Sequence, residues 1–143
     1  MGYQLKNLDI VDLISERHVQ LREFLENQWN NFSDIRISNT EWFILNRIYG
    51  NQPTIASITK SANITRQATH KNVKSLEAKG LVEIVNAERN KRDKCIRLTP
   101  LGERCFEKYR ELTEELERKL TLTIGVERMK VLIDALKMDW ELN

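Results

Sequence analysis

The sequence predicts a mainly α-helical domain with one small β-hairpin, and three observations support this. Apolar side chains recur at steps of three and four residues through most of the chain, which is the spacing of one helix face. The five glycines and two prolines, apart from Gly2, stand where these patterns stop. After Gly80, residues 81–85 and 94–99 instead have the apolar, β-branched composition of two strands joined by a charged turn.

Length and composition narrow the class of protein further. The 143 residues fit a single domain, and 41% hydrophobic with 31% charged residues exclude both a disordered and a membrane-spanning chain. The first residues have neither the apolar core of a secretion signal nor a myristoylation motif. The two cysteines, Cys95 and Cys105, do not make a disulfide framework or a metal-ligand spacing. We therefore expect a cytoplasmic protein without metal or cofactor.

Local signals place the first two helices. The first helix is expected from about residue 9 to 31, and its apolar stripe is Val11, Ile14, His18, Leu21, Leu25, Trp29 and Phe32. Ser38 and Glu41 have the spacing of a capping box, in which each side chain accepts a hydrogen bond from the other's backbone N–H. The box predicts a second helix that begins at residue 38 and ends at Gly50.

The next two helices are short and separated by a tight turn. Thr54 can cap a helix that stops near Asn63, and Thr65 can cap a longer one that ends at Gly80, a favoured left-handed stop. After the hairpin, Thr99 and Pro100 begin a helix that runs to about residue 124. Its stripe is Leu101, Cys105, Tyr109, Leu112, Leu116 and Leu120. A last helix follows Gly125, with Val126, Met129, Ile133, Leu136 and Trp140 in heptad-like register.

The net charge of +2 is unevenly distributed. Residues 54–97 hold ten basic and four acidic side chains, whereas residues 1–53 and 98–143 each have a small acidic excess. A basic middle segment between acidic ends favours attraction to a polyanion through that segment alone.

A short helix, a tight turn, a second helix and a basic hairpin together describe a winged helix-turn-helix, whose second helix lies in the DNA major groove. On the expected helix from 65 to 80, the polar side chains lie opposite Thr69, Val73 and Leu76. The candidate DNA-binding residues on this side are Thr65, Arg66, Gln67, His70, Lys71 and Lys74. Arginine, glutamine and histidine suit base edges, whereas the lysines and the capped helix N-terminus suit phosphates.

The hairpin supplies the rest of the candidate interface. Arg89, Lys91, Arg92 and Lys94 cluster near its tip, where they could follow the phosphates or place an arginine in the minor groove. We take Arg89, Lys91 and Arg92 as candidate DNA-binding residues.

At this point the sequence resembles the MarR-type transcriptional regulators over nearly its whole length in element order. The resemblance is most specific in Thr65-Arg66-Gln67, in the run from Leu76 to Val82, in the wing and in Leu98-Thr99-Pro100-Leu101-Gly102. It implies that Arg92 is the arginine that enters the minor groove. The sequence departs from the family pattern at Asn90, where an aspartate is usual, and at Ala68, where serine or threonine is frequent.

The terminal helices carry more apolar side chains than a small DNA-binding core needs. The resemblance implies that these helices form a homodimer. We expect residues 38–99 to form the DNA-binding lobe and residues 8–32 and 101–142 the helical dimerisation region. Such a dimer would place two recognition helices about 34 Å apart, one turn of DNA. Packing within a monomer is the alternative.

The resemblance also implies a small aromatic effector between the dimer helices and the DNA-binding lobe. The candidate lining residues are His18, Trp29, Trp42, Arg47 and Tyr109. Tryptophans on helical stripes are more often core residues, so a purely structural role stays open. The alternative to an effector is redox sensing through Cys95 or Cys105, since oxidation of Cys95 in a wing strand could disturb DNA binding.

An enzyme is not expected. The sequence has no nucleophile motif, no glycine-rich phosphate loop and no metal-ligand cluster. The function predicted is that of a homodimeric regulator, most simply a repressor, that reads a palindromic operator in double-stranded DNA. A winged-helix module that binds an acidic protein partner is the alternative.

Overall fold

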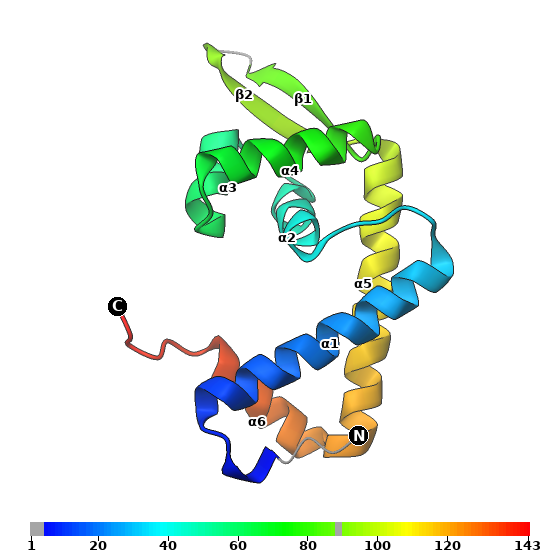
Figure 1. Cartoon of the computed structure of the whole chain (residues 1–143), viewed down its shortest axis with the longest axis vertical. Helices are drawn as coiled ribbons and strands as arrows, with labels where there is room; N and C mark the ends of the chain where they lie inside the picture. Colours follow the sequence, from blue (N-terminus) through cyan, green and yellow to red (C-terminus); the bar gives the residue numbers. More distant parts are fainter. Residues whose placement is uncertain (1–4, 88–89) are drawn as a thin grey trace.

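The computed structural model describes residues 5–87 and 90–143 and is divided into two parts joined by one long helix. After a short 3-10 helix η1 (Leu5–Asn7), α1 (Ile10–Phe32) lies across α5 (Pro100–Ile124), and α6 (Val126–Lys137) folds back beside them. These three helices form what we call the helical base, at the bottom of Figure 1. The winged lobe, residues 38–99, lies at the other end of α5.

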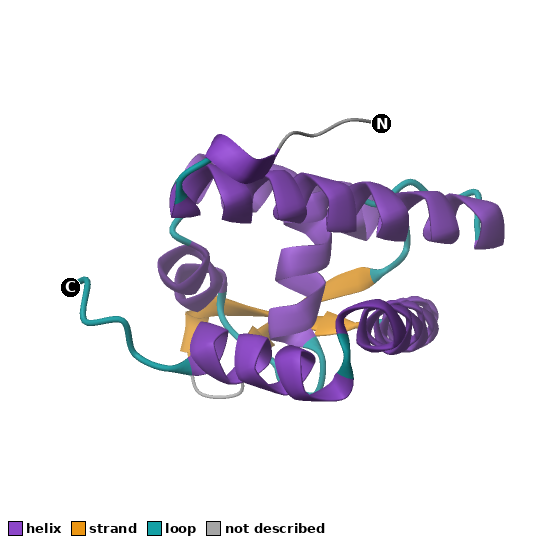
Figure 2. Ribbon diagram, turned by 90° about the horizontal axis from the view of Figure 1, so that it is seen from below, coloured by secondary structure: helices purple, strands orange, loops and turns teal. Residues whose placement is uncertain are grey.

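The winged lobe contains three helices and the hairpin. The helices are α2 (Asn39–Ile48), α3 (Ile55–Ala62) and α4 (Arg66–Ala78), and the strands are β1 (Val82–Ala87) and β2 (Asn90–Leu98). The strands pair antiparallel, with Val82 opposite Leu98 and Val85 opposite Cys95. Figure 2 shows these two strands, in orange, among the surrounding helices. The expected fold class, mainly α with a β-hairpin wing, is confirmed.

The helix boundaries follow from the predicted caps. The side chains of Thr54, Thr65 and Thr99 each accept a hydrogen bond from the backbone N–H three residues later. Ser38 and Glu41 form the complete capping box, which satisfies two otherwise free N–H groups at the start of α2. Asn63, with φ of 51°, ends α3 in the left-handed conformation, and its side chain type tolerates that region.

The junction between lobe and base is tight. Gly80 has φ of +76°, a conformation that glycine adopts without steric cost. The Thr99 hydroxyl donates to the Gly80 carbonyl at 2.6 Å. At Gly102, in the first turn of α5, a Cβ atom would collide with the carbonyl oxygen of Leu81. Glycine at this position therefore lets α5 approach the start of the hairpin closely.

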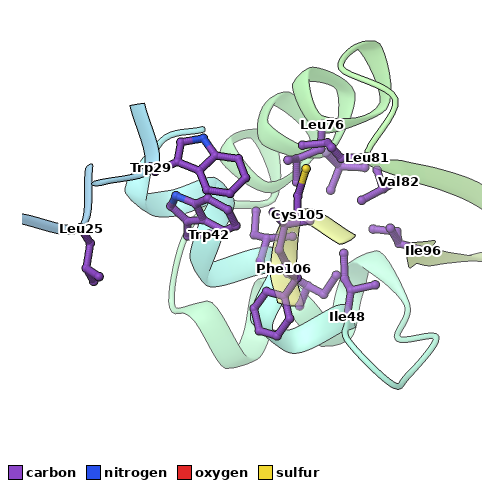
Figure 3. Packing of buried hydrophobic residues seen from close by; sticks show 14 of the residues in the cluster. Leu25, Trp29, Trp42, Ile48, Leu76, Leu81, Val82, Ile96, Cys105 and Phe106 are labelled. Carbon is purple, nitrogen blue, oxygen red and sulfur yellow. The ribbon is translucent and has the colours of Figure 1, made fainter. Parts of the chain in front are cut away.

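One hydrophobic core joins the two parts. It contains Ile44, Leu45 and Ile48 from α2, Val73 and Leu76 from α4, Ile96 from β2, and Cys105 and Phe106 from α5, all buried. Figure 3 shows the labelled members of this cluster, with Trp29 and Trp42 next to one another and Cys105 near Leu76 and Leu81. In the described residues no helix is long and apolar enough to cross a membrane.

One expectation for the helical base is wrong in detail. The last helix ends at Lys137, so Trp140 lies beyond it, where its indole N–H donates to the Ala135 carbonyl at 2.6 Å. The helical part of the expected region 101–142 is correspondingly shorter. On α1, the predicted stripe residues Val11 and Ile14 are exposed in the single chain, because this helix meets α5 mainly through its second half, at Leu25 and Trp29.

Candidate nucleic-acid interface

Helix α4 has one buried and one polar, exposed face, as predicted. Thr69, Val73 and Leu76 are at most 1% exposed, and the apolar side chains among them fix the helix against α2 and β1. The opposite side carries exposed polar side chains, five of which are candidate DNA-binding residues. These are Arg66, Gln67, His70, Lys71 and Lys74. An exposed, polar helix face of this length has the dimensions to enter a major groove.

The turn between α3 and α4 is held by hydroxyl groups. The buried Thr69 hydroxyl donates to the Thr65 carbonyl at 3.1 Å and lies 2.8 Å from the Thr59 hydroxyl of α3. Thr65 itself caps α4 through the Ala68 N–H at 3.0 Å. The hydroxyl of Thr65 is therefore engaged with its own helix, and the free N–H groups of the first turn give this end a positive partial charge.

The exposed face has two interactions of its own. Lys74 and Glu77 form an ion pair at 3.4 Å, and the Asn72 amide donates to the Ala68 carbonyl at 2.8 Å. Both contacts are local to α4. Neither contact involves Arg66 or Gln67, which lie at the N-terminal end of α4. In a helix-turn-helix, the N-terminal residues of the recognition helix contact the base edges.

The hairpin completes one side of the lobe, and Figure 1 shows it projecting from the lobe at the end opposite α1 and α6. Lys91 and Arg92 lie in β2, in its first half. Arg89 lies outside the described residues. At the end of the hairpin far from its tip, Arg97 and Glu83 occupy opposite positions on the two strands and form an ion pair.

Three of the five candidate effector residues come together where α1, α2 and α5 meet. Trp42 packs edge-on against Trp29, with ring centroids 4.9 Å apart, and stacks on Tyr109 at 4.1 Å. Beside this stack lies a hollow of about 220 Å³, lined by Trp42, Phe43, Phe106 and Tyr109 among others. This aromatic cluster, Trp29, Trp42 and Tyr109, lies between the helical base and the lobe.

The other two candidates lie elsewhere. His18 is exposed on α1. Arg47 stacks its guanidinium on the Phe43 ring at 3.2 Å and donates to the Ser61 hydroxyl at 3.1 Å. Burial lowers the pKa of Arg47, although arginine stays charged at any physiological pH. Its contacts join α2 to α3 inside the winged lobe.

Sequence reasoning missed Arg22 beside the aromatic cluster. Its guanidinium donates to the Tyr109 hydroxyl at 2.9 Å and lines the same hollow. Burial raises the pKa of Tyr109, and the charge of Arg22 opposes that rise in part. The sequence signal that could have identified Arg22 is its spacing from Trp29. The two residues are seven positions apart, which is about two helical turns, so they lie on the same face of α1.

Sequence reasoning also missed the role of Glu41 beyond its cap. Glu41 is only 4% exposed. Its carboxylate forms an ion pair with Lys79 at the C-terminal end of α4. No local pattern pairs residues 38 positions apart, so this contact could not be found from the spacing alone.

The two cysteines differ in their surroundings. Cys105 is buried in the core, and this burial raises the pKa of its thiol, which disfavours the reactive thiolate. Cys95 is half-buried in β2 and forms an isolated antiparallel β-bridge with Thr54. Within the part of the chain that the structure describes, no three His, Cys, Asp or Glu side chains gather in a way that could hold a metal ion.

Comparison with known proteins agrees with this geometry. The sequence model of the MarR family matches residues 37–93. No curated protein matches the chain in sequence.

Solved structures match nearly the whole chain. The MepR–DNA complex from Staphylococcus aureus superimposes with a TM-score of 0.75 at 21% identity, covering 91% of this chain and 95% of that one. Apo MarR from Escherichia coli gives 0.73 at 21% identity, covering 91% and 96%. The transcriptional regulator BldR from Sulfolobus solfataricus gives 0.72 at 20% identity and covers 95% of each chain.

Proposed function

The chain has the MarR-type winged-helix fold, and on this premise we propose that it is a homodimeric transcriptional regulator that binds double-stranded DNA. The observation that supports this most directly is α4, whose buried face fixes it in the lobe while its other face presents Arg66, Gln67, His70, Lys71 and Lys74. One of the similar structures is itself a complex with DNA.

The roles on α4 follow from side-chain chemistry. Arg66 can bind guanine through two hydrogen bonds, and Gln67 can bind adenine in the same way. Lys71 and Lys74 reach phosphates, which sets the register of the protein on DNA without reading sequence. In the wing, Arg89, Lys91 and Arg92 add positive charge, and Arg92 is the side chain assigned to the minor groove.

The proposal divides the chain into a DNA-binding lobe, residues 38–99, and a dimerisation region, residues 8–32 and 101–142. The support is the distribution of exposed large apolar side chains, all of which lie in residues 10–32 or 122–142 of the described chain. A second copy that covers these surfaces would remove them from water, which stabilises the dimer. The two-fold symmetry of such a dimer favours a palindromic operator.

Repression is the simplest outcome of such binding, because a dimer on an operator can occlude a promoter. A small aromatic effector is a further part of the proposal. The aromatic cluster and Arg22 offer ring faces and a cation beside the hollow at the junction of base and lobe, a combination suited to a planar anion.

Selection from a pool of random duplexes tests the DNA-binding function. We expect recovery of an inverted repeat with half-site centres about one helical turn apart. Arg66→Ala should weaken binding to that repeat by about 1–3 kcal/mol and relax the preference at one base pair, whereas Lys71→Ala should weaken all duplexes alike. Retention that depends on salt but not on sequence contradicts the proposal.

The effector is tested with benzoate as the probe. In a Trp140→Phe variant the remaining fluorescence comes from Trp29 and Trp42, and we expect saturable quenching by benzoate together with release of the selected duplex. Arg22→Met is the matched variant, in which both responses should be weaker. Quenching that does not saturate, with no release of DNA, argues against an effector site in this cluster.

A further inference from the structure

A buried polar cluster joins the start of α2 to the end of the recognition helix α4. The two carboxylate oxygens of Glu41 each lie 2.8 Å from the Lys79 ammonium, and one of them accepts from the Ser75 hydroxyl at 3.1 Å. The other accepts from the Ser38 backbone N–H at 3.0 Å. The side chains of Glu41 and Lys79 are 5% and 28% exposed.

These contacts give Glu41 a full set of partners. Burial alone would raise the pKa of its carboxyl, but the hydrogen bonds from Lys79 and Ser38 and the charge of Lys79 outweigh it and hold the pKa below its ordinary value. Glu41 is therefore ionised at neutral pH. Charge-assisted hydrogen bonds to two oxygens are strong and directional, so the pair fixes an orientation as well as a contact.

The same turn of α2 is fixed from its other side by the neighbouring residue. Trp42 stacks on Tyr109 of α5 and packs edge-on against Trp29 of α1. Adjacent residues thus connect in two directions, Trp42 to the helical base and Glu41 to α4. Because Glu41 and Trp42 are adjacent in the chain, the first turn of α2 connects the aromatic cluster to α4 through the hydrogen bonds of Glu41.

The position of the polar cluster on α4 makes small movements consequential. Ser75 and Lys79 lie at the C-terminal end, whereas Arg66 and Gln67 lie at the N-terminal end, roughly 12–20 Å away at 1.5 Å per residue. A tilt of about 5° at one end displaces the other by more than about 1 Å over that length. The apolar contacts of Val73 and Leu76 are non-directional, so they do not fix this tilt alone.

We infer that Glu41 is a positioning residue for DNA binding: through Lys79 and Ser75 it sets the tilt of α4 relative to the helical base and hence the spacing of the two recognition helices in the dimer. This inference rests on the proposed function. Glu41 itself is buried and does not touch DNA.

The sign of the effect separates positioning from electrostatics. Glu41→Gln removes a negative charge, which by itself strengthens attraction to DNA. Positioning predicts the opposite, at least a tenfold weaker binding to the selected inverted repeat. Glu77→Gln is the matched control, because it removes the same charge from the exposed Lys74–Glu77 pair on α4. It should leave the affinity unchanged or raise it.

The spacing of the half-sites supplies a readout that a loss of stability does not change. Wild-type protein should discriminate sharply against duplexes with one base pair added or removed between half-sites. Glu41→Gln should show a flatter preference. Lys79→Met should lose at least as much affinity as Glu41→Gln, because it also removes a positive charge, and the double variant should lose no more than Lys79→Met, since each change breaks one shared pair.

Circular dichroism checks that each variant is folded. If Glu41→Gln is unfolded at the assay temperature, Ser75→Ala is tested in its place. We expect Ser75→Ala to lower the affinity for the repeat about threefold. The inference is overturned if a folded Glu41→Gln protein, or in its place Ser75→Ala, binds the repeat as tightly as wild type with the same spacing preference. It is equally overturned if the losses of Glu41→Gln and Lys79→Met add. If the wild type selects no sequence, the proposed function itself fails.

Discussion

The winged lobe and the helical base differ in how much of their apolar side-chain surface each leaves exposed. Within the described residues, the lobe buries Ile44, Leu45 and Ile48 fully and leaves no large apolar side chain exposed. The base leaves Val126 at 67% and Leu136 at 54% exposed. Since soluble monomers rarely expose large apolar patches, this difference is what we expect if, as proposed, a second copy covers the base.

The polar residues follow the same division. In the lobe, the cationic side chains of Arg66, Lys71 and Lys74 lie on the exposed face of α4. In the base, cations lie over aromatic rings of the same chain: Lys119 over Phe24 at 4.9 Å and Lys108 over Phe32 at 4.8 Å. The lobe therefore has exposed cations on α4 in addition to the internal contact of Arg47 with Phe43, whereas in the base the two lysines help to hold α1 against α5.

The largest expected effect comes from removing a core side chain of the lobe. Ile48→Ala should lower the free energy of unfolding by about 3–4 kcal/mol, because Ile48 is 0% exposed and a cavity remains. Leu132→Ala, at a side chain 44% exposed in α6, should cost under about 0.5 kcal/mol in dilute monomer. Urea unfolding at low protein concentration measures both, and equal losses would remove the distinction between lobe and base.

A charge placed on the exposed stripe of α6 tests what covers it. Leu136→Asp should raise the dimer dissociation constant about 100-fold, since burying an unpaired carboxylate at an interface costs about 3 kcal/mol. Sedimentation equilibrium measures this. Ala56→Asp, on the exposed side of α3, is the control and should leave the dimer intact. A Leu136→Asp protein that sediments as wild type contradicts the assignment of the base.

Most of the fold could be predicted because its signals are local. The caps at Ser38, Thr54, Thr65 and Thr99 depend on residues three positions apart, and all four are confirmed. The same is true of the buried face of α4, which one helical period determines. Where a helix continues without a strong local stop, the prediction was less exact, as at Trp140 beyond the end of α6.

The candidate site was predictable only in part for the same reason. The exposed face of α4 follows from its own sequence, but contacts between distant residues do not. Arg22 meets Tyr109 across 87 positions and Glu41 meets Lys79 across 38. Such pairs are set by how α1, α2, α4 and α5 pack, which no spacing within one element encodes. Trp29, Trp42 and Tyr109 were grouped with His18 and Arg47 on the family resemblance, and the packing shows that these three rings form one cluster from which the other two are absent.

The smallest expected effect is a pH dependence at the Glu41–Lys79 contact, which joins α2 to the end of α4 within the winged lobe. The pKa of Glu41 is lower in the folded chain than its ordinary value of 4.5, because the Lys79 and Ser38 hydrogen bonds outweigh burial. Folding therefore favours the carboxylate. Its contribution to stability is fully present above the unfolded value and is lost as pH falls through the folded one.

Glu41→Gln lacks this titration, so the two proteins should converge in acid. We expect wild type to melt about 4 °C higher at pH 7, which corresponds to about 1 kcal/mol for a chain of this size. The difference should shrink steadily below about pH 4.5, the ordinary value of the carboxyl. Thermal melts of both proteins between pH 7 and 3 measure it. A difference that is constant over this range would mean that Glu41 acts through its shape and its cap at Ser38, and that its charge contributes nothing to holding α2 against α4.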